Sequence, residues 1–312
     1  MQFTEALING NIEAIRQCPK ADLHNHFVLG GSRKYLLEHS GRDIRPITKP
    51  LNSMDEMHAW NTENIGDFFD TPEGRRMLIN ATFIQAKEDG VTILEIGEDV
   101  WGLGAFFNNN IDELVDAFET AHREIAPEIE LRLQIGMSRH CNIAYLEECL
   151  SHFWGCRAFY SIDLYGDELA QPIENFIPIY RRAKAEGLRL KAHVGEWGTA
   201  EGVRWAVECL ELDEVQHGIA AVYDSSVVHF LTDNRIRLNI TPSSNFLLGR
   251  VKEMKTHPVA ELYRNGVDVT INSDDILIFD SDVSKEYLRL YQSGCLMAEE
   301  LNDIRINGLK PV

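Results

Sequence analysis

Apolar segments of strand length recur along the chain, and each is followed by a longer segment that can form a helix. Several of these segments are almost continuous in Val, Ile and Leu, as strands of a parallel sheet are when both faces are buried. Eight such segments are present, at residues 21–27, 91–98, 131–137, 159–165, 188–194, 214–220, 237–242 and 268–272.

The intervening segments have the spacing of amphipathic helices. Between residues 173 and 186, Phe176, Ile177, Tyr180 and Ala183 are spaced at three- and four-residue steps, and Gly187 follows as a C-cap. Eight strand–helix units in one chain of 312 residues predict a single α/β domain, residues 1–312, folded as a closed (β/α)₈ TIM barrel. The alternative is an open doubly wound sheet, and the lack of a G-x-G-x-x-G motif before the first helix counts against it.

The interval between the first two strand segments is too long for a single helix. We therefore expect a helical insertion after the first strand, within about residues 33–90, that lies over the barrel mouth like a lid. Its apolar side chains suit either a lid or ordinary packing on the barrel rim. They are Met54, Met57, Trp60, Phe68 and Phe69.

Charge and composition limit the range of partners. The chain has 30 basic and 49 acidic residues, a net charge of −19, so it repels nucleic acids and anionic membranes but can still admit a small molecule. It has no N-terminal leader pattern and no apolar run of about 18 residues. The six cysteines are scattered without a C-x-x-C pair, which is typical of a cytoplasmic protein. No pattern in the sequence sets the oligomeric state.

Polar residues stand where the first and fifth strand segments end. These positions matter because the C-terminal ends of barrel strands form the face that carries the active site. His24 and His26 are two residues apart, so they point the same way if the strand continues through them. His193 ends the fifth segment, and Glu196 follows three residues later. Each feature alone also fits core packing or a solvated loop.

The sixth and eighth segments end in further groups of this kind. His217 ends one, and Asp274 and Asp275 end the other, where buried carboxylates are costly unless a cation or hydrogen bonds compensate them. In a closed barrel the first and eighth strands are neighbours and the fifth reaches across the axis, so these groups can surround one point. Nitrogen and carboxylate ligands suit zinc, although iron, cobalt and manganese also accept them. The predicted ligands of one zinc ion are His24, His26, His193 and Asp274.

Six short motifs, in order along the chain, resemble those of the adenosine deaminase family within the amidohydrolase superfamily. They are PKADLHNH at 19–26, IDLYGDE at 162–168, KAHVGE at 191–196, QHG at 216–218, TPSSN at 241–245 and SDD at 273–275. The motifs span most of the chain, and each falls at an expected strand end. Together they are far more specific than any one of them.

The resemblance implies a zinc-dependent hydrolytic deaminase of adenosine or a related 6-aminopurine, with one Zn²⁺ per chain and release of ammonia by metal-activated water. His24, His26, His193 and Asp274 would bind the metal. Glu196, His217 and Asp274 would be catalytic. The Gly166 amide and Asp275 would bind the purine-like substrate.

The sequence departs from the family pattern just after the first histidine pair. Where relatives carry an aspartate that contacts the sugar, this chain has an apolar loop, Phe27-Val28-Leu29-Gly30-Gly31. The exact substrate is therefore open. The alternatives are an amidohydrolase that acts on another amino-heterocycle or a cyclic amide, or a catalytically silent barrel that only binds.

Overall fold

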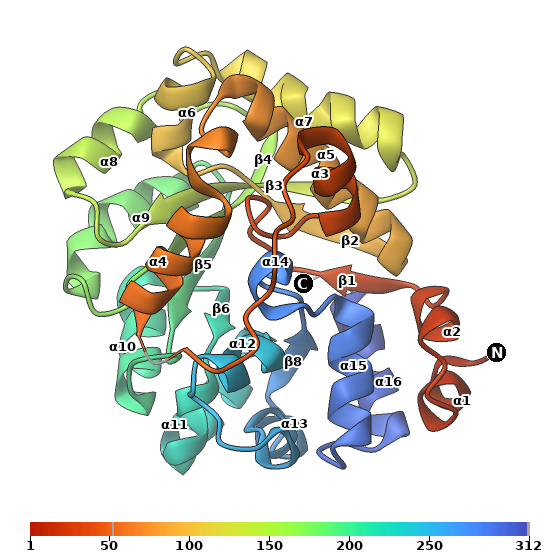
Figure 1. The fold of residues 1–312 in the computed structure, drawn as a ribbon. Coiled ribbons are helices and arrows are strands. Elements are labelled where there is room, and N and C mark those ends of the chain that lie inside the picture. Colours follow the sequence, from red (N-terminus) through yellow and green to blue (C-terminus); the bar gives the residue numbers. More distant parts are fainter. Residues whose placement is uncertain (52, 311–312) are drawn as a thin grey trace.

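The chain folds as a parallel (β/α)₈ barrel, which confirms the predicted fold class (Figure 1). The computed structural model describes residues 1–51 and 53–310, apart from the side chains of residues 54 and 68. Eight strands follow one another around the barrel in chain order. They are β1 (Lys20–Asp22), β2 (Val91–Ile96), β3 (Glu130–Ser138), β4 (Phe159–Tyr165), β5 (Arg189–Val194), β6 (Glu214–His217), β7 (Arg237–Ile240) and β8 (Asp268–Ile271).

The barrel closes between β8 and β1 beyond the ends of both strands. There Asn25 and Asp274 form an isolated parallel bridge, and the Asp274 N–H donates to the His24 carbonyl oxygen at 2.9 Å. This closure brings the segment after β1 directly beside the segment after β8. Those two segments carry three of the predicted metal ligands.

The two faces of the strands differ in polarity. On β5 the side chains of Leu190, Ala192 and Val194 are buried with the apolar core, while Lys191 and His193 alternate with them. Lys191 contacts Glu95 of β2, which is not a neighbouring strand, so these polar side chains lie inside the barrel. The interior is thus filled by hydrogen-bonded polar groups, and the outward apolar face packs against helices.

Helices surround the barrel and bury the face that the sequence pattern predicted. Helix α10 (Ala200–Leu210) begins at the Thr199 cap and buries Val203, Ala206 and Val207. The other helices outside the insertion are α1 (Phe3–Ile8), α2 (Ile12–Arg16), α5 (Pro72–Asp89), α6 (Val100–Phe106), α7 (Ile111–Ile125), α8 (Ile143–Leu150), α9 (Ile177–Ala185), α11 (Ser225–Asp233), α12 (Pro242–Leu247), α13 (Val259–Arg264), α14 (Ile276–Phe279), α15 (Val283–Gln292) and α16 (Ala298–Gly308). Short 3₁₀ turns are η2 (Ile173–Phe176), η3 (Ile219–Tyr223) and η4 (Met254–Thr256).

The insertion between β1 and β2 consists of α3 (Arg33–Ser40), α4 (Met54–Asn64) and η1 (Gly66–Phe69), and it precedes the barrel helix α5. Figure 1 shows α3 and α4 in red and orange on the viewed face of the barrel. Met57 of α4 borders the cavity at the strand ends, whereas Phe69 is fully buried and the Trp60 Nε1 donates to the Arg45 carbonyl oxygen at 3.2 Å. The side chains of Met54 and Phe68 lie outside the described residues.

The predicted extent of the first strand was wrong. Regular pairing stops at Asp22, so His24 and His26 lie in irregular backbone and not on one face of a strand. The Asp22 carboxylate accepts hydrogen bonds from the Ser273 N–H at 3.1 Å and the Ser273 hydroxyl at 2.5 Å. These bonds tie the chain to the end of β8, so the backbone leaves the β1–β2 ladder there.

The helix expected at residues 173–186 is also interrupted, because the separate turn η2 ends at Phe176 and α9 begins at Ile177, with Pro178 in its first turn. Among the described residues, no helix is both long enough and apolar enough to span a membrane.

Candidate metal and catalytic site

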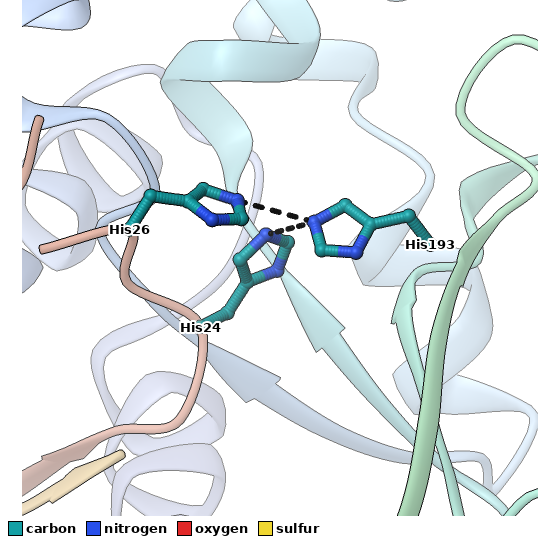
Figure 2. A group of neighbouring side chains, drawn as sticks. All are labelled: His24, His26 and His193. Atoms are coloured by element: carbon teal, nitrogen blue, oxygen red, sulfur yellow. Dashed lines mark hydrogen bonds between the residues drawn. The ribbon is translucent and has the colours of Figure 1, made fainter. Parts of the chain in front are cut away.

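Three imidazole rings meet at the C-terminal end of the barrel with their Nε2 atoms facing one another. The His193 Nε2 lies 3.0 Å from the His24 Nε2 and 3.2 Å from the His26 Nε2 (Figure 2). His24 and His26 come from the segment after β1, and His193 comes from β5. The irregular backbone after β1 thus achieves the convergence that a regular strand was expected to provide.

The other ring nitrogens fix which atoms carry protons. The His24 Nδ1 donates to the Asn239 carbonyl oxygen at 3.1 Å, and the His193 Nδ1 donates to the Asp163 carboxylate at 3.3 Å. The Nε2 atoms of His24 and His193 therefore direct their lone pairs at the centre of the cluster. A single imidazolium proton could serve only one of the two short N–N contacts, whereas one metal ion satisfies all three nitrogens.

The Asp274 carboxylate completes the cluster. Its Oδ1 lies 3.5 Å from the His26 Nε2 and 3.7 Å from the His24 Nε2. Asp274 has a φ of 62°, a left-handed conformation that is costly for a residue with a side chain and is concentrated at functional sites. The closure of the barrel beyond β8 holds it there.

The distances fit a single zinc ion. Two nitrogens that are each about 2.0–2.1 Å from zinc, at an angle of about 90–110°, lie about 2.9–3.4 Å apart. The N–N separations of 3.0 and 3.2 Å fall in this range, and the N–O separations of 3.5 and 3.7 Å correspond to somewhat wider angles. The donor set of three nitrogens and one oxygen is one that zinc accepts.

Electrostatics within the cluster favours a bound cation. Burial lowers the pKa of His24 to about 3 and also lowers the pKa of His26, so both rings are neutral and able to act as ligands. Burial acts in the same direction on His193, but the Asp163 carboxylate outweighs it and raises the His193 pKa. Burial opposes ionisation of Asp274, yet the surrounding imidazoles lower its pKa.

A second group of polar side chains adjoins the imidazoles. The Glu196 Oε2 lies 3.6 Å from the His217 Nε2, and the Asn245 amide donates to the Glu196 Oε1 at 3.4 Å. The His217 Nδ1 lies 3.0 Å from the Thr241 hydroxyl and 3.2 Å from the Asn245 Nδ2. Burial raises the pKa of Glu196 to about 8, with the Asp274 charge adding to it, and burial lowers the pKa of His217 well below its usual range.

A cavity of about 440 Å³ opens over these groups. Asp275 is buried at its edge, and its Oδ1 has no hydrogen-bond partner among the described residues. Gly166, at the end of β4, borders the same cavity with a φ of 86°. His140 also lines it, as do residues of α4 and η1. The structure therefore places the predicted site residues around one cavity, except His24, which is buried behind its wall against His193.

The sequence singled out the ligands but not the groups that orient them. In the sequence Asp163 and Glu168 stand out only as members of a motif. In the structure Asp163 holds the His193 ring, and Glu168 binds the backbone of the turn after β5. The Asn239 contact is made by a main-chain carbonyl oxygen, so no side-chain pattern could reveal it. An aspartate placed two residues before the end of an apolar strand was the one available signal for Asp163.

Comparison with known proteins decides the family. The family model described as adenosine deaminase matches residues 19–312. A putative adenosine/adenine deaminase of Treponema pallidum is 32% identical, and the match covers 95% of this chain and 99% of that protein. The chain belongs to the adenosine deaminase family. This member is accordingly a hydrolytic deaminase that acts on C–N bonds.

Solved structures agree with the fold of this adenosine deaminase family member. An adenine deaminase from Arthrobacter aurescens matches with a TM-score of 0.79 at 23% identity, covering 93% of this chain and 92% of the other. An amidohydrolase from Burkholderia ambifaria with bound Zn matches with a TM-score of 0.78 at 19% identity, covering 99% of this chain and 88% of the other. At these identities the likeness supports the barrel fold alone.

Proposed function

We propose that this protein is a zinc-dependent deaminase of adenosine or a related 6-aminopurine, with one zinc ion per chain. The observation that carries the proposal is the convergence of three imidazole Nε2 atoms and the Asp274 carboxylate beside Glu196 and His217. The family membership supports the reaction class, and the donor set of three imidazole nitrogens and one carboxylate supports the choice of metal.

The residues that would hold zinc are His24, His26, His193 and Asp274. The chemistry that zinc supplies when bound is a water molecule whose pKa is lowered to about 7, and thus a nucleophile at neutral pH. Asp163 and the Asn239 carbonyl oxygen keep the Nδ1 atoms of His193 and His24 engaged, so that the Nε2 atoms remain free to bind.

Glu196 and His217 suit opposite directions of proton transfer. With a pKa of about 8, the Glu196 carboxyl carries a proton at neutral pH and can donate it to a ring nitrogen, which makes the adjacent amino-bearing carbon electrophilic. His217 stays neutral because it is buried. When the His217 Nδ1–H donates a hydrogen bond to the Thr241 hydroxyl, the Nε2 is free to orient the attacking water and accept its proton. Asp274 would accept a hydrogen bond from the same water.

The remaining groups of the cavity would select the substrate. Asp275 would hydrogen-bond the purine through its unpartnered Oδ1, and the Gly166 N–H would bind a third ring nitrogen. Helix α4 and η1 border the cavity, and we propose that this insertion of the single domain acts as a lid that excludes water. Phe27 and Leu29 are buried in the apolar loop after β1, where a sugar would find no carboxylate.

The test is ammonia release by zinc-loaded protein from adenosine, 2′-deoxyadenosine, adenine, AMP, guanine and cytosine compounds. Turnover of a 6-aminopurine that disappears in Glu196→Gln supports the proposal, provided that the matched control Glu201→Gln, an exposed glutamate on α10, remains active. Stoichiometric zinc with no turnover across this panel would contradict the purine assignment and leave a different heterocycle as the substrate.

A further inference from the structure

A single buried carboxylate binds four successive backbone amides beside the site. The Glu168 Oε1 accepts from the Gly195 N–H at 2.6 Å. The Oε2 accepts from the N–H groups of Glu196, Trp197 and Gly198 at 3.1, 2.8 and 3.1 Å. Glu168 is only 5% exposed, and the four amide hydrogen bonds compensate the burial of its charge together with the more distant Arg139.

This carboxylate joins the two turns that face the cavity. Glu168 follows β4 by three residues, two residues after Gly166, and the four amides belong to the turn that carries Glu196 from β5 towards α10. The same carboxylate therefore sets the position of the Glu196 backbone relative to the Gly166 backbone. Since the proposed function places both groups on one substrate ring, their separation determines whether the ring can contact both at once.

We propose that Glu168 is a positioning residue that holds the Glu196 carboxyl and the Gly166 amide at the spacing that the substrate ring requires. The inference rests on the proposed function, which assigns both groups to that ring. Glu168 itself touches only backbone amides of the turn in the contacts described, and it acts through Glu196.

The turn is shaped to receive the carboxylate. A Cβ on Gly198 would lie 2.4 Å from the Glu168 Oε1, so a glycine at this position is what allows the close approach. Gly195 has a φ of 75°, and a Cβ there would lie 2.3 Å from the Val203 Cγ2 of α10. The turn thus lies between α10 on one side and Glu168 on the other, and the hydrogen bonds to Glu168 hold the side that α10 does not cover.

The first test is Glu168→Gln, which keeps the size of the side chain. A glutamine has one acceptor oxygen, and its NH₂ group would face amide donors, so several of the four hydrogen bonds are lost. We expect kcat/KM for the aminopurine to fall by about 100-fold, because displacing a catalytic group by about 1 Å has an effect of this size. The matched control is Glu174→Gln, an exposed glutamate of η2 that bonds the Trp205 Nε1, and it should keep wild-type kcat/KM.

The second variant, Gly198→Ala, distinguishes the position of the turn from the charge of Glu168. It keeps the carboxylate charge and disturbs only the packing of the turn at residues 195–198 against that carboxylate. We expect it to lower kcat/KM at least tenfold, with zinc content unchanged. Hydrogen exchange of the amides at 195–198, measured without substrate, should accelerate in both variants and not in Glu174→Gln.

Near wild-type kcat/KM in both Glu168→Gln and Gly198→Ala would overturn the inference. So would a loss confined to Glu168→Gln, because it would indicate a role for charge and not for position. Absence of any aminopurine turnover by the wild-type protein would instead contradict the proposed function. In that case, unchanged exchange at 195–198 in both variants would still count independently against the positioning role.

Discussion

The polar interior of the barrel predicts a large stability cost when its central cation is removed. Lys191 is completely buried, and its Nζ lies 2.8 Å from the Glu95 Oε2 and 3.1 Å from the Glu214 Oε2. Replacing it in Lys191→Met keeps an unbranched side chain of similar volume, so the change in packing is small. The substitution leaves Glu95 without its ion-pair partner and leaves Glu214 with Arg189 as its one remaining ion pair among the described residues.

The magnitude follows from the contact itself. Burial alone would raise the pKa of Glu214, but Lys191, together with the Asn239 hydrogen bond and the charges of Arg237 and Arg189, lowers it to about 2, against an ordinary value of 4.5. A carboxyl group whose pKa is lower in the folded than in the unfolded protein stabilises the fold at pH values above its unfolded pKa. This contribution disappears as the pH falls from 4.5 towards 2. The shift corresponds to about 3 kcal/mol at neutral pH for all of these groups together, and Lys191 is the largest contributor among them. For the removal of Lys191 we use the roughly 3–5 kcal/mol that is lost when one partner of a buried ion pair is removed.

The assay is urea unfolding of metal-free protein at pH 7, with the wild type and variant compared at equal m-values. We expect Lys191→Met to lose about 3–5 kcal/mol, and the triple variant with Glu95→Gln and Glu214→Gln to recover most of this loss. Lys184→Met, which removes an exposed pair with Glu211, should cost under about 1 kcal/mol. A loss below about 1 kcal/mol in Lys191→Met would refute the claim that the buried cation supports the barrel.

Three further outcomes follow from individual contacts. Asp163→Asn should weaken zinc binding about 10–100-fold in a chelator competition, because the charge that supports His193 is lost; unchanged affinity would contradict this. Burial lowers the His257 pKa to about 3 from 6.5, so the wild-type protein loses folding free energy as the pH falls below 6.5. In unfolding titrations, the stability of His257→Asn relative to wild type should therefore rise by about 2 kcal/mol between pH 7 and pH 5. A difference that does not change with pH would exclude this. Gly166→Ala, at a φ of 86°, should raise KM for the aminopurine more than tenfold, and an unchanged KM would argue against the amide contact.

The sequence alone determined the order and number of the strands and the chemistry at their ends. The apolar run at residues 159–165 has the same first and last residue as β4. Such runs reveal strands because the outward face of a barrel strand is covered by helices and therefore needs apolar side chains. The histidines and carboxylates stood out because such groups are costly to bury at strand ends without a purpose. These signals are local, and they are readable without coordinates.

Only the tertiary structure decided how those groups meet. His24 and His26 leave the strand, because Asp22 bonds to Ser273 across the barrel closure, a contact between residues 251 positions apart. The Nε2 atoms face one another because a main-chain oxygen and Asp163 engage other ring nitrogens.

The polar residues inside the barrel and Glu168 likewise could not be placed from the sequence. A residue such as Lys191 looks like a solvent-facing position in an alternating strand, and only the barrel's closure turns it inward against Glu95 and Glu214. Residue type and spacing set which groups are available. Their burial, protonation and mutual distances depend on contacts between distant segments, because desolvation and charge interactions exist only once the chain has brought those segments together.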